Sequence, residues 1–181
     1  MPEAMLFEPT DIAGAFVLVP QRHEDDRGYF ARTFCTDELA ERGLVTRVAQ
    51  CSVSWNRRAG TLRGMHYQAA PHEETKVVRC TAGAVYDVMI DLRPDSPSYR
   101  RWQAFELTAV NGRALYIPAG VAHGFQTLVD ASELLYMIST PYEPTAARGV
   151  RWDDPAFAIA WPACADRTMS ERDRAFPPWR S

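Results

Sequence analysis

The sequence predicts an all-β fold, a sandwich or barrel of short strands, and three observations support it. Runs rich in β-branched and aromatic residues recur along the first 140 residues. Turn-forming segments such as RRAG, AAPHEE and RPDSPSYR separate these runs, a spacing typical of sandwiches and barrels. The length of 181 residues suits one domain, and no repeat or linker interrupts it. We therefore expect a single domain over residues 1–181.

The predicted strands follow one another with little between them. Two come first, AFVLVP (15–20) and the aromatic part of HEDDRGYFARTF (23–34). The later runs are TRVAQCSVSWN, TLRGMHYQ, TKVVRCTAG, AVYDVMIDLRP, RWQAFELTAV, RALYIPAGVAHGFQTLVD and SELLYMISTPY. The pattern ends after Pro141, so residues 142–181 are predicted to form a packed C-terminal tail with at most a helical turn or two.

One short helix is predicted between the first strands and the rest, over TDELAERG (36–43). Thr36 is a suitable N-cap, because its hydroxyl could accept from a free amide of the first turn. Gly43 is expected to end the helix, since glycine adopts the left-handed conformation easily.

The composition excludes several classes of partner. The net charge is −3 and no basic run is present, so we expect no nucleic-acid partner. No membrane span or signal peptide is visible, and a cytoplasmic protein is the simplest interpretation. The four cysteines lack CxxC spacing, which argues against a redox motif or zinc knuckle and predicts free, buried thiols. Only one of the twenty basic residues is lysine, and this makes Lys76 conspicuous.

The strand TLRGMHYQ (61–68) combines an arginine, a glycine and a histidine within four residues. Side chains at i and i+2 share a face of a strand. Arg63 and His66 are three apart and should therefore lie on opposite faces, unless a bulge at Gly64 shifts the register.

The segment IPAGVAHGF has a tight turn that would direct His123 into the interior of the sheet. Such a turn is similar to one in the double-stranded β-helix, or jelly-roll, proteins called cupins, where this histidine often binds a metal. The companion His-x-His is missing, because His66 and His72 are six residues apart. We therefore expect no metal site, and a hydrogen-bonded interior histidine is the simplest role for His123.

Four further residues allow a structural or a functional interpretation when each is taken alone. Lys76 could be a solvated lysine at a strand end. Asp87 shares a strand face with Met89 and Asp91 and needs a donor, for which an interior histidine would serve, but it could also lie at the surface. Tyr136 could belong to the core. Asp173, in SERDRAF, could be a solvated carboxylate at a helix end.

Taken together, these segments resemble one family. DDRGYF, TLRGMHYQ, KVVRCTAGAVYDVMIDLRPDSP, LYIPAGVAHGFQTL, RGVRWDDP and MSERD follow in the order found in the dTDP-4-dehydrorhamnose 3,5-epimerases. The resemblance covers about residues 15 to 175. It implies an all-β double-stranded β-helix, a cupin jelly roll with a few short peripheral helices. It also implies an enzyme that needs no cofactor and forms a homodimer, in which the N-terminal strands are exchanged.

The resemblance implies a role for each member of the proton-transfer set. His66 corresponds to the catalytic base, Asp173 to the carboxylate paired with it, and Tyr136 to the acid on the opposite side. Lys76 corresponds to a group near the keto oxygen of the sugar, and Asp87 to an acidic partner in the same cluster.

Further positions correspond to substrate-binding residues. Arg63 corresponds to an arginine facing the phosphates or the sugar, and His123 to a group near the sugar. Gln50 also falls in this set. Arg172 takes the place of a lysine before the tail aspartate. Arg27 corresponds to an arginine that reaches the nucleotide of the neighbouring subunit.

Several positions outside the proton-transfer set depart from the family pattern. Met137 replaces a lysine, and Pro141 replaces the first of two tyrosines, which leaves only Tyr142. Arg32 and Ala147 stand where acidic residues are usual. We expect these changes to lie at nucleotide and sugar contacts, so the identity of the nucleotide and the number of inverted carbons stay open.

The sequence thus predicts an epimerase of a nucleotide-linked 4-keto-6-deoxy sugar, with dTDP-4-dehydro-6-deoxy-D-glucose as the first candidate substrate and carbons 3 and 5 as the centres inverted. A single-centre 3- or 5-epimerase acting on another nucleotide sugar, such as a CDP-linked one, is an alternative. A non-catalytic or metal-dependent cupin is the alternative from another class.

Overall fold

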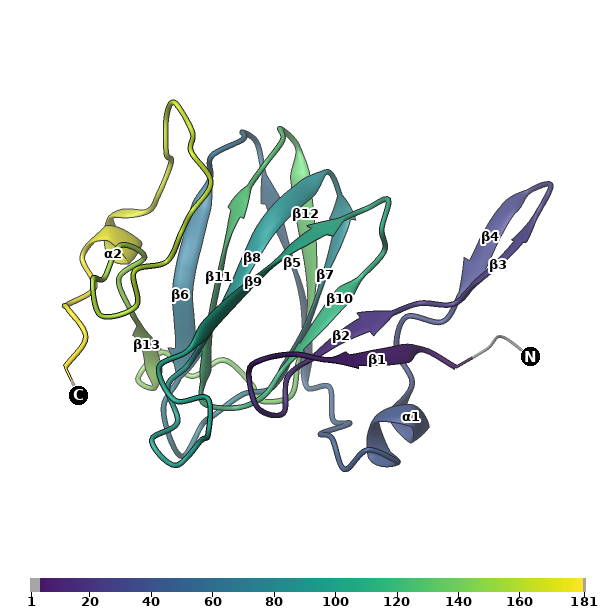
Figure 1. The fold of residues 1–181 in the computed structure, drawn as a ribbon, viewed down its shortest axis with the longest axis horizontal. Helices are drawn as coiled ribbons and strands as arrows, with labels where there is room; N and C mark the ends of the chain where they lie inside the picture. The colour runs from purple at the N-terminus through teal and green to yellow at the C-terminus, as the bar shows by residue number, and fades with distance from the viewer. Residues whose placement is uncertain (1–3, 181) are drawn as a thin grey trace.

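The computed structural model describes residues 4–180, which are almost entirely β-structure (Figure 1). The strands are β1 Leu6–Pro9, β2 Phe16–Val19, β3 Arg22–Asp25, β4 Gly28–Ala31, β5 Gln50–Asn56, β6 Leu62–Gln68, β7 Lys76–Ala82, β8 Ala84–Asp91, β9 Trp102–Thr108, β10 Ala114–Ile117, β11 Val121–Thr127, β12 Ser132–Ile138 and β13 Ala147–Gly149. The helices are α1 Thr36–Ala40 and α2 Glu171–Arg174. None of the described helices is long and apolar enough to cross a membrane.

Eleven of these strands form two antiparallel sheets that pack face to face, and β3 and β4 form a separate two-stranded sheet. One sheet has the order β1-β2-β10-β7-β12-β5, and the other has the order β13-β6-β11-β8-β9. The main core lies between them, where Val78 and Leu115 of the first sheet meet Met89 and Phe125 of the second. Neighbouring strands are often distant in the sequence, as in a jelly roll. The predicted double-stranded β-helix is therefore confirmed.

Helix α1 differs from its prediction at the N-terminus. The N-cap is Cys35, whose side chain makes no capping hydrogen bond, and Thr36 is already helical. The helix also ends earlier than the predicted range of 36–43, at Ala40 with Glu41 as the C-cap, and residues 41–43 form a turn. Gly43 has φ of +68°, and the amides of Gly43 and Leu44 donate to the carbonyls of Ala40 and Leu39. Crossed bonds of this kind around a left-handed glycine end a helix.

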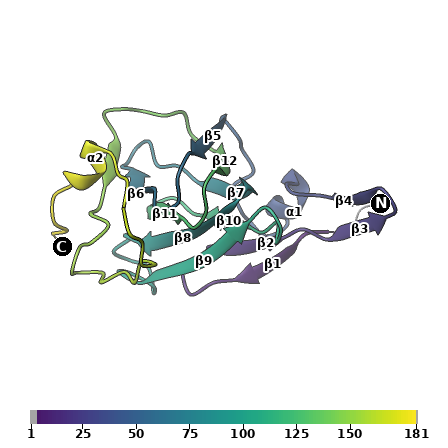
Figure 2. The same cartoon turned by 90° about the horizontal axis from the view of Figure 1, so that it is seen from above.

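The hairpin β3–β4 projects from the sheets, at the end of the molecule opposite the C-terminal tail (Figures 1 and 2). All four residues of β3 are exposed, and Phe30 of β4 is 67% exposed. A single chain therefore leaves apolar surface uncovered here. The exchange of N-terminal strands between subunits stays a prediction.

The residues after Pro141 pack against the outer side of the second sheet (Figure 1). Val150 and Phe157 bury against Met65 of β6 in a second apolar cluster. The tail also adds β13 to the edge of this sheet, a strand that the sequence analysis did not predict. Helix α2 contacts β6, and this contact brings a tail residue to the site described below.

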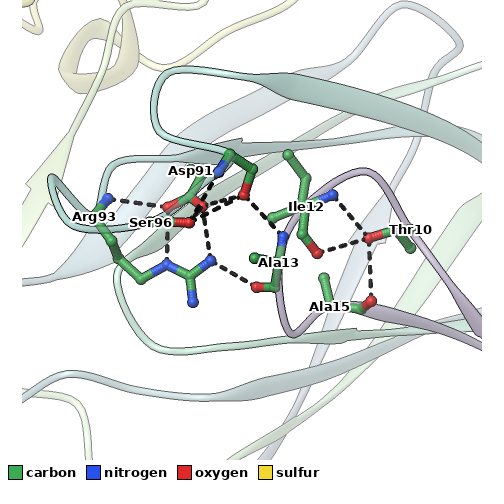
Figure 3. Close-up of polar contacts among 8 residues, drawn as sticks. Thr10, Ile12, Ala13, Ala15, Asp91, Arg93 and Ser96 are labelled. Carbon is green, nitrogen blue, oxygen red and sulfur yellow. Dashed lines mark hydrogen bonds and ion pairs between the residues drawn. The ribbon is translucent and has the colours of Figure 1, made fainter.

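A buried carboxylate ties the β1–β2 turn to the end of β8 (Figure 3). Asp91 accepts hydrogen bonds from the backbone amide and the guanidinium of Arg93, and from the hydroxyls of Ser96 and Ser98. Arg93 in turn donates to the carbonyl of Ala13 over 2.7 Å. This network ties the β1–β2 turn to the segment that follows β8.

Candidate active site

A cavity of about 330 Å³ is lined by residues of both sheets. Ten residues were predicted to form the site, and the structure brings most of them to this cavity. Those that line it are Arg63, His66, Lys76, His123, Tyr136 and Arg172. Asp173 and Asp87 lie directly behind His66 and His123, and Gln50 lies near the rim.

The bulge predicted at Gly64 places Arg63 and His66 on the same cavity. His66 pairs with His123 and Arg63 pairs with Phe125, so three steps along β6 match two along β11. Gly64 has φ of +136°, and a Cβ there would lie 2.5 Å from Cα of Gly124. Only glycine fits this close contact between backbones, which explains the unusual composition of the strand.

His66 is paired with Asp173, as predicted. Nε2 of His66 lies 2.7 Å from Oδ1 of Asp173, and the backbone amide of Gly64 donates to Oδ2 over 3.3 Å. The hydroxyl of Ser170 caps α2 by accepting from the amide of Asp173, which fixes the position of the aspartate. Burial acts to raise the pKa of Asp173, but the hydrogen bonds from His66 and Gly64 and the charge of His66 bring it below its ordinary value. An ionised Asp173 therefore orients the imidazole and can stabilise an imidazolium.

Lys76 is buried at the start of β7, and its side chain points into the cavity. Nζ lies 2.9 Å from Oε1 of Glu74 and donates to the carbonyl of His66 over 3.2 Å. The next inward side chains of β7, Val78 and Cys80, belong to the core. The single lysine is thus a buried, paired cation beside the strand of the histidine, and not a solvated residue.

His123, Asp87 and Tyr136 form a second cluster on the cavity. Nε2 of His123 lies 2.9 Å from both carboxylate oxygens of Asp87, which is completely buried. The rings of His123 and Tyr136 meet edge to face across the two sheets, with centroids 5.8 Å apart. Burial raises the pKa of Asp87, and His123 and Lys76 only partly oppose this. Burial and the nearby Asp87 raise the pKa of Tyr136 well above its ordinary value, so the phenol stays protonated at neutral pH.

Two arginines supply positive charge from different sides. Nε of Arg63 donates over 2.8 Å to the side-chain oxygen of Asn56, a buried residue at the end of β5. Arg172 of α2 reaches the hydroxyl of Tyr142. The backbone amide of Tyr142 donates to the side-chain oxygen of Gln50, so Gln50 supports the rim and does not line the cavity.

Arg27 lies far from these residues in its own chain. It stands in the turn of the β3–β4 hairpin, its side chain is 89% exposed, and it pairs with Asp25. It does not line the cavity. A role for Arg27 in binding the nucleotide would require a second subunit.

Comparisons with known proteins agree on one family. The family model described as dTDP-4-dehydrorhamnose 3,5-epimerase matches residues 9–181. A relative of that name from Sinorhizobium fredii is 39% identical over 97% of this chain and 90% of its own. The chain belongs to the dTDP-4-dehydrorhamnose 3,5-epimerase family.

Other members of the epimerase family extend the comparison. A Streptomyces niveus relative named dTDP-4-dehydrorhamnose 3-epimerase is 37% identical over 94% of this chain and 82% of its own. The crystal structure of the Bacillus anthracis 3,5-epimerase with TDP and PPi bound has a TM-score of 0.92 and 38% identity, and the match covers 97% of this chain and all of that one.

The structure of this epimerase-family chain also shows cavity residues that the sequence analysis did not single out. They include Glu74, Arg148 and Tyr67, while Asn56 holds Arg63 from behind. One signal could have found Glu74: it stands two residues before Lys76, so an extended chain directs both side chains to the same side. The strand that carries Arg148 was hidden because the tail has no alternating pattern.

The departures from the family pattern do not all lie at the cavity. Of the departing positions, Ala147 lines it and Pro141 does not. Arg32 pairs with Glu38 near α1, and Met137 packs beside Val77 in an apolar cluster. Arg32, Met137 and Pro141 therefore do not line the cavity of one chain. The expectation that these positions contact the substrate stays a prediction.

Within residues 4–180, no group of three His, Cys, Asp or Glu side chains is placed to hold a metal ion. The four cysteines are free, but only Cys80 is buried, and Cys51 is exposed. The expectation of buried cysteines was therefore wrong for three of the four. Burial raises the pKa of the Cys80 thiol to about 11, which makes it unreactive at neutral pH.

Proposed function

We propose that this protein is a cofactor-independent epimerase of a dTDP-linked 4-keto-6-deoxy sugar, which inverts carbons 3 and 5. One observation carries the proposal. His66, on a strand of one sheet, and Tyr136, on a strand of the other, line the same cavity. Inversion by proton transfer needs a base and an acid on opposite sides of the sugar, and these two residues supply them.

His66 acts as the base. The 4-keto group acidifies the protons on carbons 3 and 5, and His66 removes one of them to leave an enolate. Nε2 is engaged by Asp173, so Nδ1 is the nitrogen that accepts the proton. Asp173 then stabilises the imidazolium. A positioned base of this kind contributes about 10²- to 10⁴-fold in rate.

Lys76 and His123 stabilise the enolate oxygen. Both line the cavity and both are held by buried carboxylates, Lys76 by Glu74 and His123 by Asp87. Donors that are oriented before the reaction stabilise developing charge without reorganisation, and the loss of one costs about 10²- to 10³-fold.

Tyr136 returns a proton to the opposite face. Its raised pKa keeps the phenol protonated, so it can donate at neutral pH. The enolate carbon forms a new C–H bond with the phenol proton, which restores the 4-keto group with the centre inverted and leaves a phenolate. The imidazolium of His66 then releases its proton to solvent, and the phenolate takes one up, so both groups return to their starting states.

The remaining cations suit the diphosphate. Guanidinium groups donate in a fork to phosphate oxygens, and Arg63, Arg148 and Arg172 all line the cavity. We propose that Arg27 of a second subunit completes the nucleotide site in a cytoplasmic homodimer. Light scattering should then give twice the mass of one chain, and a monomer would contradict this part.

The first experiment is proton NMR of dTDP-4-keto-6-deoxyglucose in heavy water with the purified protein. Loss of the signals at carbons 3 and 5 supports the double epimerase. Loss at one carbon would make it a single-centre epimerase, the activity named for the Streptomyces niveus relative. No loss at either carbon would contradict the proposed substrate.

The variant His66→Asn then tests the assignment of the base. It should abolish exchange at both carbons without changing the free energy of unfolding by much, because the asparagine side chain is polar and the site is partly open. A variant that exchanges protons at the wild-type rate would show that another group is the base.

A further inference from the structure

Glu74 is the only acidic side chain among the described residues that line the cavity. The other charged residues there are Arg63, Lys76, Arg148 and Arg172. The Glu74 side chain is only 10% exposed. A buried carboxylate in a cavity built to bind a diphosphate would weaken binding unless it met a specific part of the ligand.

The backbone on both sides of Glu74 is fixed to the end of β12. The amide of Thr75 donates to the hydroxyl of Ser139 over 2.9 Å, and the amide of Ser139 donates back to the carbonyl of Thr75 over 3.0 Å. The hydroxyl of Thr140 donates to the carbonyl of Glu73 over 2.8 Å. The position of the Glu74 carboxylate is therefore set before any ligand arrives.

One oxygen of this carboxylate has a partner in the protein. Oε1 pairs with Lys76, and Oε2 has no hydrogen-bond partner within residues 4–180. A ligand that fills the cavity removes water from Oε2, and an acceptor left without a donor in this way weakens binding. The ligand must then provide a donor. A sugar hydroxyl is a donor, whereas a diphosphate is not and would be repelled.

The position of Lys76 indicates which hydroxyl this is. In the proposed reaction Lys76 meets the oxygen on carbon 4, and Glu74 lies 2.9 Å from its ammonium nitrogen. Carbon 4 has two neighbours in the ring. Carbon 5 carries a methyl group and the ring oxygen, neither of which can donate, and carbon 3 carries a hydroxyl.

We infer that Glu74 is a specificity-determining residue whose carboxylate accepts a hydrogen bond from the hydroxyl on carbon 3 of the sugar. The inference rests on the proposed function. It means that the site selects 4-keto sugars with a free donor next to the keto carbon. It also fixes the direction of the substrate, with the sugar at Glu74 and the diphosphate near Arg63 and Arg172.

The test compares two dTDP-linked 4-keto-6-deoxy sugars, one with and one without the hydroxyl on carbon 3. NMR in heavy water gives kcat/KM for proton exchange at any carbon where both sugars exchange. The wild type should prefer the hydroxylated sugar by about 10²-fold or more, because a site built for a hydroxyl rejects an analogue that lacks it. In Glu74→Leu the preference should fall below about tenfold, mainly through lost rate on the hydroxylated sugar, and Glu74→Gln should be intermediate.

Glu73→Gln is the matched control, because Glu73 precedes Glu74 and does not line the cavity. It should keep the wild-type preference, and all variants should bind dTDP with the same affinity. Should Glu74→Leu fail to fold, a fall of at least threefold in the preference of Glu74→Gln, with Glu73→Gln unchanged, serves as the test.

Two results would overturn the inference. In the first, the preference is the same in the wild type and the Glu74 variants, and the carboxylate then serves only to pair with Lys76. In the second, the wild type exchanges protons in both sugars equally well. Failure of the proposed function looks different, because the wild type would then exchange no protons in either sugar.

Discussion

Strand β8 carries two aspartates whose side chains are both closed to solvent and whose pKa values shift in opposite directions. Asp87 and Asp91 lie on one face of the strand, separated by Met89, and neither is exposed to solvent. Asp91 receives the guanidinium of Arg93, two serine hydroxyls and a backbone amide (Figure 3), and these outweigh burial and lower its pKa to about 2. Asp87 receives one histidine, and its pKa is raised.

The comparison shows that hydrogen-bond donors decide whether a carboxylate closed to solvent is a stable anion, because the bonds to Asp91 outweigh a desolvation cost that the single histidine beside Asp87 cannot offset. Asp91 has enough donors to be a stable anion, so it can hold loops together. Asp87 has too few, so its negative charge stays costly and acts on its neighbours His123 and Tyr136. A poorly satisfied charge of this kind is typical of a functional site.

Asp91→Asn should produce the largest effect, on stability. The amide would place an NH₂ group opposite Arg93 and the serine hydroxyls, leaving several buried donors without an acceptor. We expect the free energy of unfolding to fall by about 3 kcal/mol and Tm by roughly 10 °C, measured by urea and thermal unfolding. Activity per folded molecule at low temperature should be unchanged. A fall of under 1 kcal/mol would mean that the network adds little.

Asp87→Asn should produce the opposite pattern. The amide oxygen can still accept from His123, so the shape of the cluster is kept, and removing a costly charge should leave the free energy of unfolding equal or raised. The kcat for the proposed exchange should fall by about 10²-fold, because His123 loses the charge that supports it. NMR exchange rates and urea unfolding of the same preparation test both parts. A destabilised variant with normal kcat would contradict the assignment.

The two aspartates should also give stability profiles of opposite sign at acid pH. The folded pKa of Asp91 lies below its unfolded value of about 3.9, so its contribution is complete above that value and is lost as pH falls toward 2. From the two values it amounts to about 2–3 kcal/mol. Asp87 has a raised pKa, so its charge removes stability as pH rises through and above the ordinary carboxyl range.

Urea unfolding between pH 2 and 6 separates these two effects. The free energy of unfolding of Asp91→Asn should be lower than that of the wild type at neutral pH, and this difference should shrink below about pH 4. Any increase in the free energy of unfolding of Asp87→Asn over the wild type should grow with rising pH. Parallel curves for all three proteins would show that neither carboxyl changes its pKa on folding.

Some of this could be predicted from the sequence, because the patterns involved are local. The short, regularly spaced strands predicted a sandwich or barrel, and the family resemblance implied the jelly roll. The spacing of Arg63 and His66 required a bulge at Gly64 for both to share a face, and its apolar neighbours indicated that a buried Asp87 would need a donor such as a histidine. The roles of Asp91 and Glu74 could not be predicted, because their surroundings come from segments far apart in the sequence. The projecting hairpin was also missed, since a strand with aromatic residues suggests burial that one chain does not provide.

The smallest predicted effect is a change in the free energy of unfolding that distinguishes two Asp-x-Arg segments of the chain. Asp25-x-Arg27 and Asp91-x-Arg93 have the same spacing, and in each the arginine forks onto the aspartate and also donates its backbone amide. The first pair is exposed on the hairpin, and the second is buried and linked to Ala13. Arg93→Lys loses the fork and the bond to Ala13, so the free energy of unfolding should fall by about 1 kcal/mol. Arg27→Lys is the matched control and should leave it unchanged within error, because solvent already screens the exposed pair. Equal losses in the two variants would show that the sequence pattern itself, and not its burial, sets the strength of the pair.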